Sequence, residues 1–219
     1  MQTCQPLSPR DERTAPSDRA GPLRPDRTQV EAAVRTLIAA TGDDPTREGL
    51  ADTPSRVARA YEEWFAGYRR DPATLLGRVF SETSGYDDTI LLGSIPMVST
   101  CEHHLAPITG QAHVAYRPRD KVVGISKLSR LVDLFARRLQ LQERLTHQIA
   151  EAIDDALQPK GVAVIIQARH GCMSSRGVNQ HGVSMLTKCW LGDFRSDPLL
   201  RQDLMASIAM GRGPTDAAA

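Results

Sequence analysis

The sequence has little of several features that would define its class at once. Its 219 residues carry a formal net charge of +1, so bulk charge gives no reason to expect binding to nucleic acid. No apolar run approaches the roughly 18 residues of a membrane span, and the N-terminus lacks the apolar segment of a signal peptide. Four cysteines in a chain of this length form no disulfide framework. We therefore expect a cytoplasmic protein with neither membrane nor nucleic acid as partner.

The distribution of apolar and polar residues divides the chain into four regions. Residues 1–26 are rich in Pro, Arg, Asp and Ser with almost no large apolar side chain, so we expect a disordered N-terminal tail. Residues 27–89 are expected to form a helical N-terminal part, residues 90–210 the main domain, and residues 211–219 a flexible C-terminus. With 41% hydrophobic residues, the chain can bury a substantial core.

Two helices are expected in the N-terminal part. The first starts near Arg27 and ends near Gly42, because apolar residues recur at helical spacing: Val30, Val34, Leu37 and Ile38. The second has Thr53 as its N-cap and ends near Gly67. Its apolar side chains are expected to form a buried stripe: Val57, Tyr61, Trp64 and Phe65.

The main domain reads as strands and helices in alternation. A strand is expected over residues 90–97, a hairpin over residues 110–116 and 121–125, and a later strand from Gly161. Between them, Ser126 is expected to cap one helix, and a second helix runs through Leu157. Two helices between strand pairs indicate an α+β architecture.

Two thiols and an imidazole lie at spacings that suit one metal ion. Cys101 and His104 are separated by two residues at a predicted turn, and Cys172 follows the β-branched segment that starts at Gly161. Side chains alternate along a strand, so His170 and Cys172 are expected on the same face of it. Three Cys and His ligands with a fourth position open are typical of catalytic zinc. We therefore predict zinc ligation by Cys101, His104 and Cys172.

Two further histidines neighbour these ligands. His103 stands beside His104, and His170 stands two residues before Cys172. Imidazole titrates near physiological pH, so both are candidate proton carriers around a water whose pKa zinc lowers to about 7. Spacing alone leaves an alternative open, in which the cysteines are ordinary buried residues and the histidines solvated loop residues.

Basic side chains gather where a helix is expected to begin. Lys127 and Arg130 lie in the first turn of the helix that Ser126 caps, where the helix dipole already favours anions. Cations there suggest a negative ligand such as a phosphate, to which Arg176 adds a guanidinium. The alternative is that all are ordinary solvated charges. Glu143 is likewise either a helix-start carboxylate or the acceptor of paired hydrogen bonds from a guanine edge.

Several segments, in order along the chain, resemble GTP cyclohydrolase I. They lie within residues 27–208 and are EGLADTPSRVA (48–58), CEHHLAP (101–107), GISKLSR (124–130), FARRLQLQERLT (135–146) and HGCMSSRGV (170–178). The resemblance implies a zinc-dependent hydrolase that converts GTP and water to formate and 7,8-dihydroneopterin triphosphate, the first step of folate and pterin biosynthesis.

The resemblance also implies roles for individual residues. Zinc would be the cofactor, held by Cys101, His104 and Cys172, with His103 and His170 as catalytic proton carriers. The implied substrate-binding residues are Gln142 and Glu143 for guanine, Ser126, Lys127, Arg130 and Arg176 for the triphosphate, and Arg56 at a subunit boundary.

The fold implied is the tunnelling fold, an α+β arrangement in which antiparallel sheets from several subunits close a barrel with helices outside. Residues 90–210 would be its catalytic domain. The family assembles as a homodecamer of two pentamers, with active sites between subunits. We therefore expect a homo-oligomer with GTP as its substrate.

The sequence departs from the family pattern at Val183 and Met185, where small hydroxyl residues are usual. Two alternatives follow: a paralogue that runs the same reaction for a deazapurine or other specialised pathway, or a non-catalytic nucleotide-binding ring. A zinc deaminase is disfavoured, because the chain contains neither the His-x-Glu nor the Pro-Cys-x-x-Cys element of that class.

Overall fold

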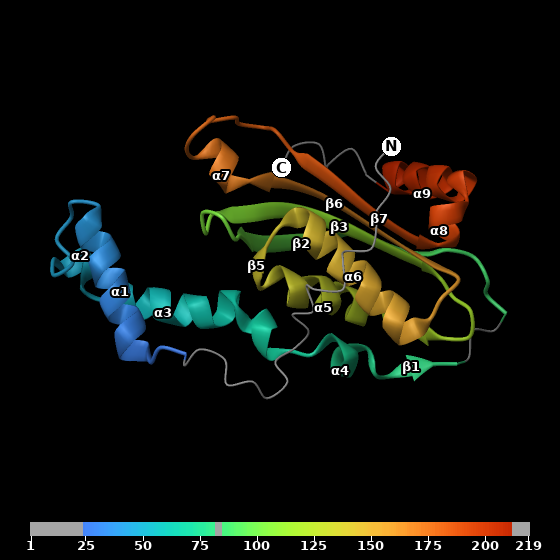
Figure 1. Ribbon diagram of the computed structural model, residues 1–219, viewed down its shortest axis with the longest axis horizontal. Coiled ribbons are helices and arrows are strands. Elements are labelled where there is room, and N and C mark those ends of the chain that lie inside the picture. Colours follow the sequence, from blue (N-terminus) through green and yellow to red (C-terminus); the bar gives the residue numbers. More distant parts are fainter. Residues whose placement is uncertain (1–23, 82–84, 212–219) are drawn as a thin grey trace.

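The computed structural model describes residues 24–81 and 85–211. Residues 1–23 of the predicted tail and residues 212–219 of the predicted C-terminal segment lie outside that range. The described residues form an N-terminal helical region and a curved sheet with helices packed on it (Figure 1). Within these residues, none of the helices has the length and hydropathy that a membrane-spanning segment requires.

The described residues before the sheet form a series of helices. They are α1 (Arg27–Ala40), α2 (Glu48–Ala51), α3 (Thr53–Trp64), the 3₁₀ helix η1 (Ala66–Arg69) and α4 (Pro72–Leu76). Asp26 caps α1 by accepting from the Gln29 amide, and the Gln29 side chain accepts from the Asp26 amide. The chain leaves α1 at the expected glycine, because Gly42 adopts a φ of 89°, in the left-handed region.

The second predicted helix differs from expectation in its cap and its buried face. The N-cap of α3 is Asp52 rather than Thr53, and no side chain caps it. Ala58 is buried, whereas Tyr61 is 36% exposed and Trp64 is 53% exposed. The predicted buried stripe is therefore wrong for the single chain. The physical reason is that α3 packs mainly against α1, which leaves its aromatic face uncovered.

A five-stranded sheet forms the centre of the main domain. Its strands, in spatial order, are β5 (Leu139–Gln140), β2 (Ile90–Cys101), β3 (Pro107–Arg117), β6 (Gly161–His170) and β7 (Met185–Gly192). Neighbouring strands are antiparallel except β5, which runs parallel to the end of β2. The end of β2 therefore has β5 on one side and the start of β3 on the other.

Helices pack on both faces of this sheet. On one face, α5 (Ile125–Ala136) and α6 (Gln142–Leu157) bury a core that includes Val164. On the other, Ala163 and Ile165 join a smaller core with residues of α8 (Asp193–Ser196) and α9 (Pro198–Met210). Successive residues of β6 thus face opposite cores, as the period of two requires. The predicted α+β class is confirmed. The helices α8 and α9 were not among the elements predicted from the sequence.

The predicted hairpin is wrong. Residues 121–125 do not pair with β3; instead β4 (Val122–Val123) pairs with β1 (Val79–Phe80) in a separate two-stranded sheet. Both edges of β3 are occupied by β2 and β6 along nearly its whole length, so no edge remains for another strand. The helix that follows, α5, has Gly124 as its N-cap, and the Ser126 hydroxyl makes no capping hydrogen bond.

Candidate functional site

The three predicted metal ligands come together in the structure. Ligand atoms of Cys101, His104 and Cys172 all lie within 4.8 Å of one another. Cys101, at the end of β2, is buried, whereas His104 is exposed and Cys172 is partly buried. Two sulfurs and one imidazole nitrogen at these separations can bind a metal ion, and this donor set suits zinc. We call these three residues the metal group.

A tight turn brings Cys101 and His104 to the same side. The Cys101 amide donates to the oxygen of Ala106 (2.8 Å), and the Leu105 amide donates to the oxygen of Cys101 (2.9 Å). Leu105 has a φ of 54°, in the left-handed region that residues other than glycine seldom occupy. Residues 101–106, the chelating turn, are thus closed by their own backbone, and the separation of the first two ligands is set locally.

Cys172 reaches the metal group by a different route from the one predicted. Strand β6 ends at His170, and Cys172 lies in the short helix α7 (Gly171–Ser174), so the two side chains do not alternate along one strand. The chain leaves the sheet at Gly171, where an added Cβ atom would lie 3.0 Å from Cδ and 3.1 Å from the oxygen of Pro107. This close contact holds α7 beside the chelating turn.

The sulfur atoms are held where a cation would stabilise their charge. Burial raises the pKa of the Cys172 thiol, and the hydrogen bond with the Cys101 side chain raises it further, while Arg176 acts in the opposite direction. Metal ligation requires thiolates, so a divalent cation offsets the cost that burial imposes on the ionised sulfurs.

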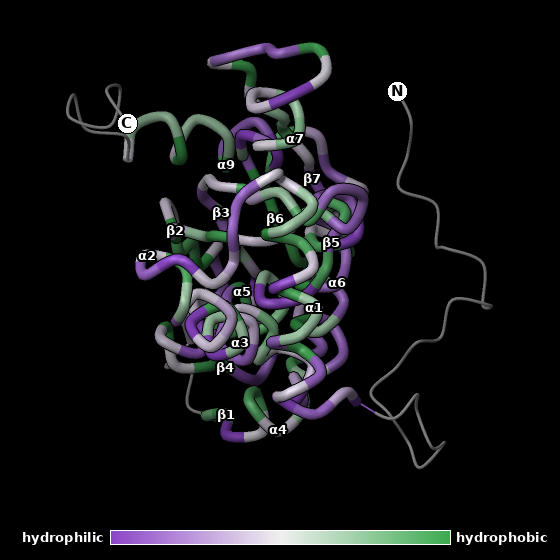
Figure 2. The backbone as a smooth tube through the Cα atoms, turned by 90° about the vertical axis from the view of Figure 1, so that its left-hand side faces the viewer, coloured by the Kyte–Doolittle hydropathy of each residue, from purple (hydrophilic) through white to green (hydrophobic). Residues whose placement is uncertain are grey.

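Arg176 lies directly beside one of the ligands. Its Nη1 atom is 2.9 Å from Nε2 of His104. A guanidinium only donates hydrogen bonds, so Nε2 of His104 is the acceptor in this contact. The segment after α7, which includes Arg176, projects beyond the sheet and is largely hydrophilic (Figure 2).

His170 is held by a chain of hydrogen bonds. Its Nε2 atom lies 2.8 Å from Oε1 of Gln142. The side-chain nitrogen of Gln142 donates to three oxygens: Ile166 O (3.0 Å), Met185 O (3.1 Å) and Thr187 Oγ1 (3.1 Å). Backbone carbonyls only accept hydrogen bonds, so the nitrogen of the Gln142 side-chain amide must face them and its oxygen must face His170. Because that oxygen is an acceptor, Nε2 of His170 is the donor. The basic nitrogen of neutral His170 is therefore Nδ1.

Two threonines that the sequence analysis missed complete this chain. The Thr146 hydroxyl donates to the Gln142 carbonyl (2.7 Å), and its oxygen lies 2.7 Å from the Thr187 hydroxyl. Thr146 follows Gln142 by four residues, so helical spacing could have placed it on the same face of α6. Thr187 lies on β7, and no local pattern connects it to α6. Gln142 itself is buried, and its amide contacts lie within the protein.

Glu143 and His103 are exposed side chains that neighbour Gln142 and His104 in the chain. Burial lowers the pKa of His170, and the Glu143 carboxylate acts in the opposite direction, which places Glu143 within electrostatic reach of that ring. Glu143 is exposed at the start of α6. His103 is exposed in the chelating turn, with its ring centroid 6.3 Å from that of His104. Both side chains are open to a ligand that approaches the metal group.

Three predicted phosphate-binding residues lie toward the other end of the sheet: Ser126, Lys127 and Arg130. They are in the first half of α5, whose start follows β4, and there the Val123 amide donates to the Tyr116 hydroxyl near the far end of β3 (3.2 Å). The opposite end of α5 adjoins the chelating turn, since Ser99 Oγ donates to Ala136 O (2.7 Å). The start of α5, which carries these three residues, therefore lies toward the opposite end of the sheet from the chelating turn.

The remaining predicted residues also have definite places. Arg56 is exposed on α3, where its guanidinium lies 3.2 Å from the Asp52 carboxylate, and α3 lies apart from the chelating turn (Figure 1). Val183 is exposed just before β7. Met185 is the first residue of β7 and contributes its carbonyl to Gln142, a backbone contact that does not depend on which side chain stands there.

Comparison with known proteins gives two sequence matches and one structural match. The profile of the family described as GTP cyclohydrolase I matches residues 30–209. A GTP cyclohydrolase 1 from Maricaulis maris (strain MCS10) is 54% identical over 182 residues, which are 83% of this chain and 89% of the relative. A crystal structure of the archaeosine synthase QueF-Like in the apo form matches with a TM-score of 0.40 and 22% identity, over 48% of this chain and 93% of that chain. The profile match and the identity over most of both sequences show that the chain belongs to the GTP cyclohydrolase I family of enzymes.

Proposed function

We propose that this enzyme uses zinc to convert GTP and water to formate and 7,8-dihydroneopterin triphosphate, as the first step of folate and pterin biosynthesis. The observation that carries the proposal is the metal group, with its ligand atoms within 4.8 Å of one another and two further histidines beside it. Family membership supports the reaction. The two thiols and the imidazole support zinc as the metal.

The residues around the metal group have separate tasks in this proposal. Bound zinc would supply a Lewis acid for hydrolysis of the purine imidazole ring. Nδ1 of His170 accepts the proton of the water that adds to C8, because its Nε2 already donates to Gln142. His103 donates a proton at N7 as the ring opens to a formamide, and a second water hydrolyses the formamide and releases C8 as formate. The ribose then undergoes an Amadori rearrangement, and the freed amine condenses with its carbonyl group to close the pterin ring, which releases one water.

Glu143 and Gln142 serve the guanine end of the pocket. The exposed Glu143 carboxylate accepts hydrogen bonds from N1 and the exocyclic amine of guanine. Gln142 contributes through His170, whose ring it orients, because its own amide nitrogen is already shared among three acceptors. The pair thus couples base recognition to the proton carrier next to it.

The triphosphate cradle requires more than one chain in this proposal. Ser126, Lys127 and Arg130 lie away from the metal group of their own chain, so a neighbouring subunit supplies them, while Arg176 comes from the same chain as the metal group. A ring of subunits provides such neighbours, and we propose the family's homodecamer of two pentamers. Arg56 on α3 would then lie at a subunit boundary.

The thiolate ligands suit a reducing compartment, so we propose a cytoplasmic location.

The departures at Val183 and Met185 favour a second candidate: the same reaction feeding a deazapurine pathway. Product analysis of the first step does not separate these destinations, but a deletion strain does. Folate auxotrophy after loss of the gene supports the first candidate, whereas loss of deazapurine-modified nucleosides alone supports the second.

The reaction is tested by incubating purified, zinc-loaded protein with GTP and identifying the products by mass. We expect formate and dihydroneopterin triphosphate in equal amounts, and no turnover of ATP, which lacks the guanine edge. GTP that is bound but returned unchanged would show that the chain is a nucleotide-binding ring and not a hydrolase.

Replacing Glu143 with glutamine is expected to weaken guanine recognition. Loss of a hydrogen-bonded charge costs about 1.5–3 kcal/mol, so kcat/KM for GTP should fall by roughly 10- to 150-fold, mainly through KM. The preference for GTP over inosine triphosphate, which lacks the exocyclic amine, should fall as well. Asp155→Asn is the matched control, because Asp155 is an exposed carboxylate farther along the same helix. Unchanged discrimination in Glu143→Gln would remove Glu143 from the base-binding role.

A further inference from the structure

We propose that the first turn of α6 assembles the metal group, with Arg144 as a positioning residue that holds the chelating turn. This inference rests on the proposed metal site and goes beyond it, because Arg144 and Glu102 belong neither to the metal group nor to the proposed substrate contacts. The metal group is split between two segments, the chelating turn after β2 and α7 after β6. Strand pairing and the Gly171–Pro107 contact bring the two halves together, and side chains that attach each half to a common element can fix their separation further.

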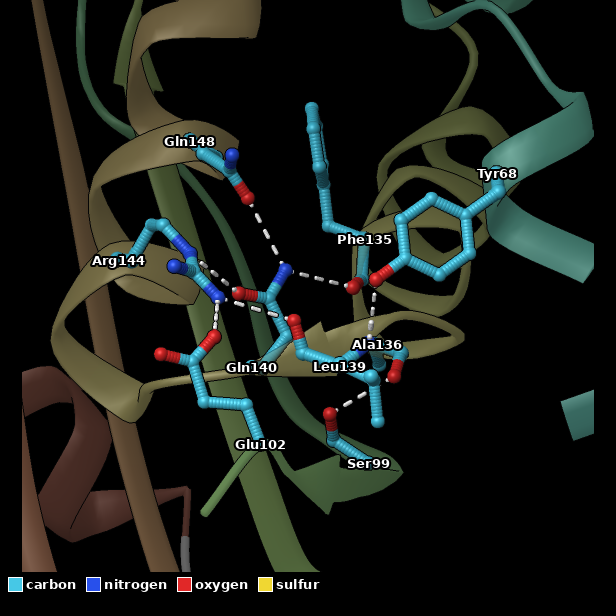
Figure 3. Close-up of polar contacts among 9 residues, drawn as sticks. All are labelled: Tyr68, Ser99, Glu102, Phe135, Ala136, Leu139, Gln140, Arg144 and Gln148. Carbon is cyan, nitrogen blue, oxygen red and sulfur yellow. Dashed lines mark hydrogen bonds and ion pairs between the residues drawn. The ribbon is translucent and has the colours of Figure 1, made fainter. Parts of the chain in front are cut away.

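The Arg144 guanidinium joins three parts of the chain (Figure 3). Its Nη2 atom forms an ion pair with the carboxylate of Glu102, which lies inside the chelating turn next to the ligand Cys101. The same Nη2 atom donates to the carbonyl of Leu139 (3.0 Å), and Nε donates to Oε1 of Gln140 (3.2 Å). Every contact uses a guanidinium donor in a fixed planar arrangement, which a lysine ammonium cannot reproduce.

The partners of Arg144 are themselves held in place. Gln140 is 1% exposed, and its amide nitrogen donates to Phe135 O (2.9 Å) and to Gln148 Oε1 (3.0 Å), which fixes the oxygen that faces Arg144 (Figure 3). The Glu102 amide also donates to the Gln140 carbonyl (3.1 Å). The chelating turn is thus attached to β5 by its backbone and to α6 by a side chain.

The second half of the metal group is attached to the same turn of α6. Gln142, two residues before Arg144, holds His170, the last residue of β6 before the helix that carries Cys172. Arg144 holds Glu102, one residue after the ligand Cys101. A single helical turn thus connects both segments. The separation of Cys101 and Cys172 depends on these two side-chain attachments together with the β2, β3 and β6 pairing.

The energetics favour a local role for this ion pair over a global one. The side chains of Arg144 and Glu102 are 33% and 29% exposed, and partly exposed pairs add little to overall stability. Groups that orient metal ligands from outside the coordination shell nonetheless affect metal affinity by about 10- to 100-fold. Loss of the Arg144–Glu102 ion pair should therefore lower the zinc affinity more than it lowers the free energy of unfolding.

The test compares four variants of the full-length protein in its native assembly: Arg144→Gln, Arg144→Lys, Glu102→Gln and the Arg144→Gln/Glu102→Gln double variant. Zinc affinity is measured by competition with a chelator, and the cobalt-substituted proteins are compared by their sulfur-to-cobalt absorption bands. Each single variant should bind zinc roughly 10- to 100-fold more weakly, with changed band intensity. The double variant should lose no more than the worse single variant, because both changes remove the same contact.

Arg117→Gln is the matched control. It breaks the Arg117–Asp193 ion pair, which has similar exposure (22% and 39%) but joins β3 to α8, away from the metal group. Its zinc affinity should equal that of the parent protein. Zinc affinity unchanged in Glu102→Gln and both Arg144 variants would overturn the inference, and so would equal losses in Arg117→Gln. If the parent protein itself bound no zinc, the proposed metal site would fail first, and the two failures are thereby distinguished.

Discussion

Cys172→Ser should contain almost no zinc after purification and should release no measurable formate from GTP. A serine hydroxyl does not ionise near neutral pH, so the site keeps only one sulfur and one imidazole as ligands. Changes outside the coordination shell already cost about 10- to 100-fold in metal affinity, and loss of a ligand should cost more. Zinc per chain is measured by elemental analysis, and formate is measured by a coupled assay.

Cys189→Ser is the control for this substitution. Cys189 is also a cysteine of the main domain, but it lies on β7 with its sulfur 3.5 Å from Nδ1 of His147 and is not part of the metal group. The control should retain its zinc and its turnover. A full complement of zinc in Cys172→Ser, or zinc lost equally from both variants, would contradict the assignment of Cys172 as a ligand.

His103→Asn should keep its zinc and lose turnover. General acid–base catalysis contributes roughly 10²- to 10⁴-fold, so kcat should fall by about that factor while KM changes little. The reason is the position of His103, which stands in the chelating turn beside His104 but is not one of the clustered ligands. Rapid-quench measurement of formate reports the chemical step directly.

His181→Asn is the matched control, because His181 is an exposed histidine in the segment between α7 and β7. It should turn over GTP at the parent rate. Loss of zinc from His103→Asn would show that His103 serves the metal and not the proton transfer, and an unchanged kcat would exclude it from the chemistry.

The sequence predicted the metal group from residue types and spacing, because a Cys-x-x-His turn is a local feature. The turn is closed by bonds within residues 101–106, so nothing distant is needed to form it. The route to Cys172 was predicted wrongly, because the strand ends at a contact between Gly171 and Pro107. That contact joins segments far apart in the chain, and β-branched periodicity carries no information about it.

Non-local packing explains the other differences. The hairpin over residues 110–125 is locally reasonable, but β3 has no unpaired edge once β2 and β6 are in place. The aromatic stripe of α3 reads as buried, yet within the described chain only part of that face meets another helix. Arg144 and Thr187 gave no signal, because their partners are set by how α6 lies on the sheet.

The contact between Arg176 and His104 has a consequence for how a substitution of Arg176 should be interpreted. Arg176 lies 2.9 Å from a proposed metal ligand and is also a proposed contact of the triphosphate. A polyphosphate that pairs with this guanidinium would therefore lie close to the bound cation, and both positive charges would stabilise it. One arginine would thus link the electrostatics of nucleotide capture to those of the metal site.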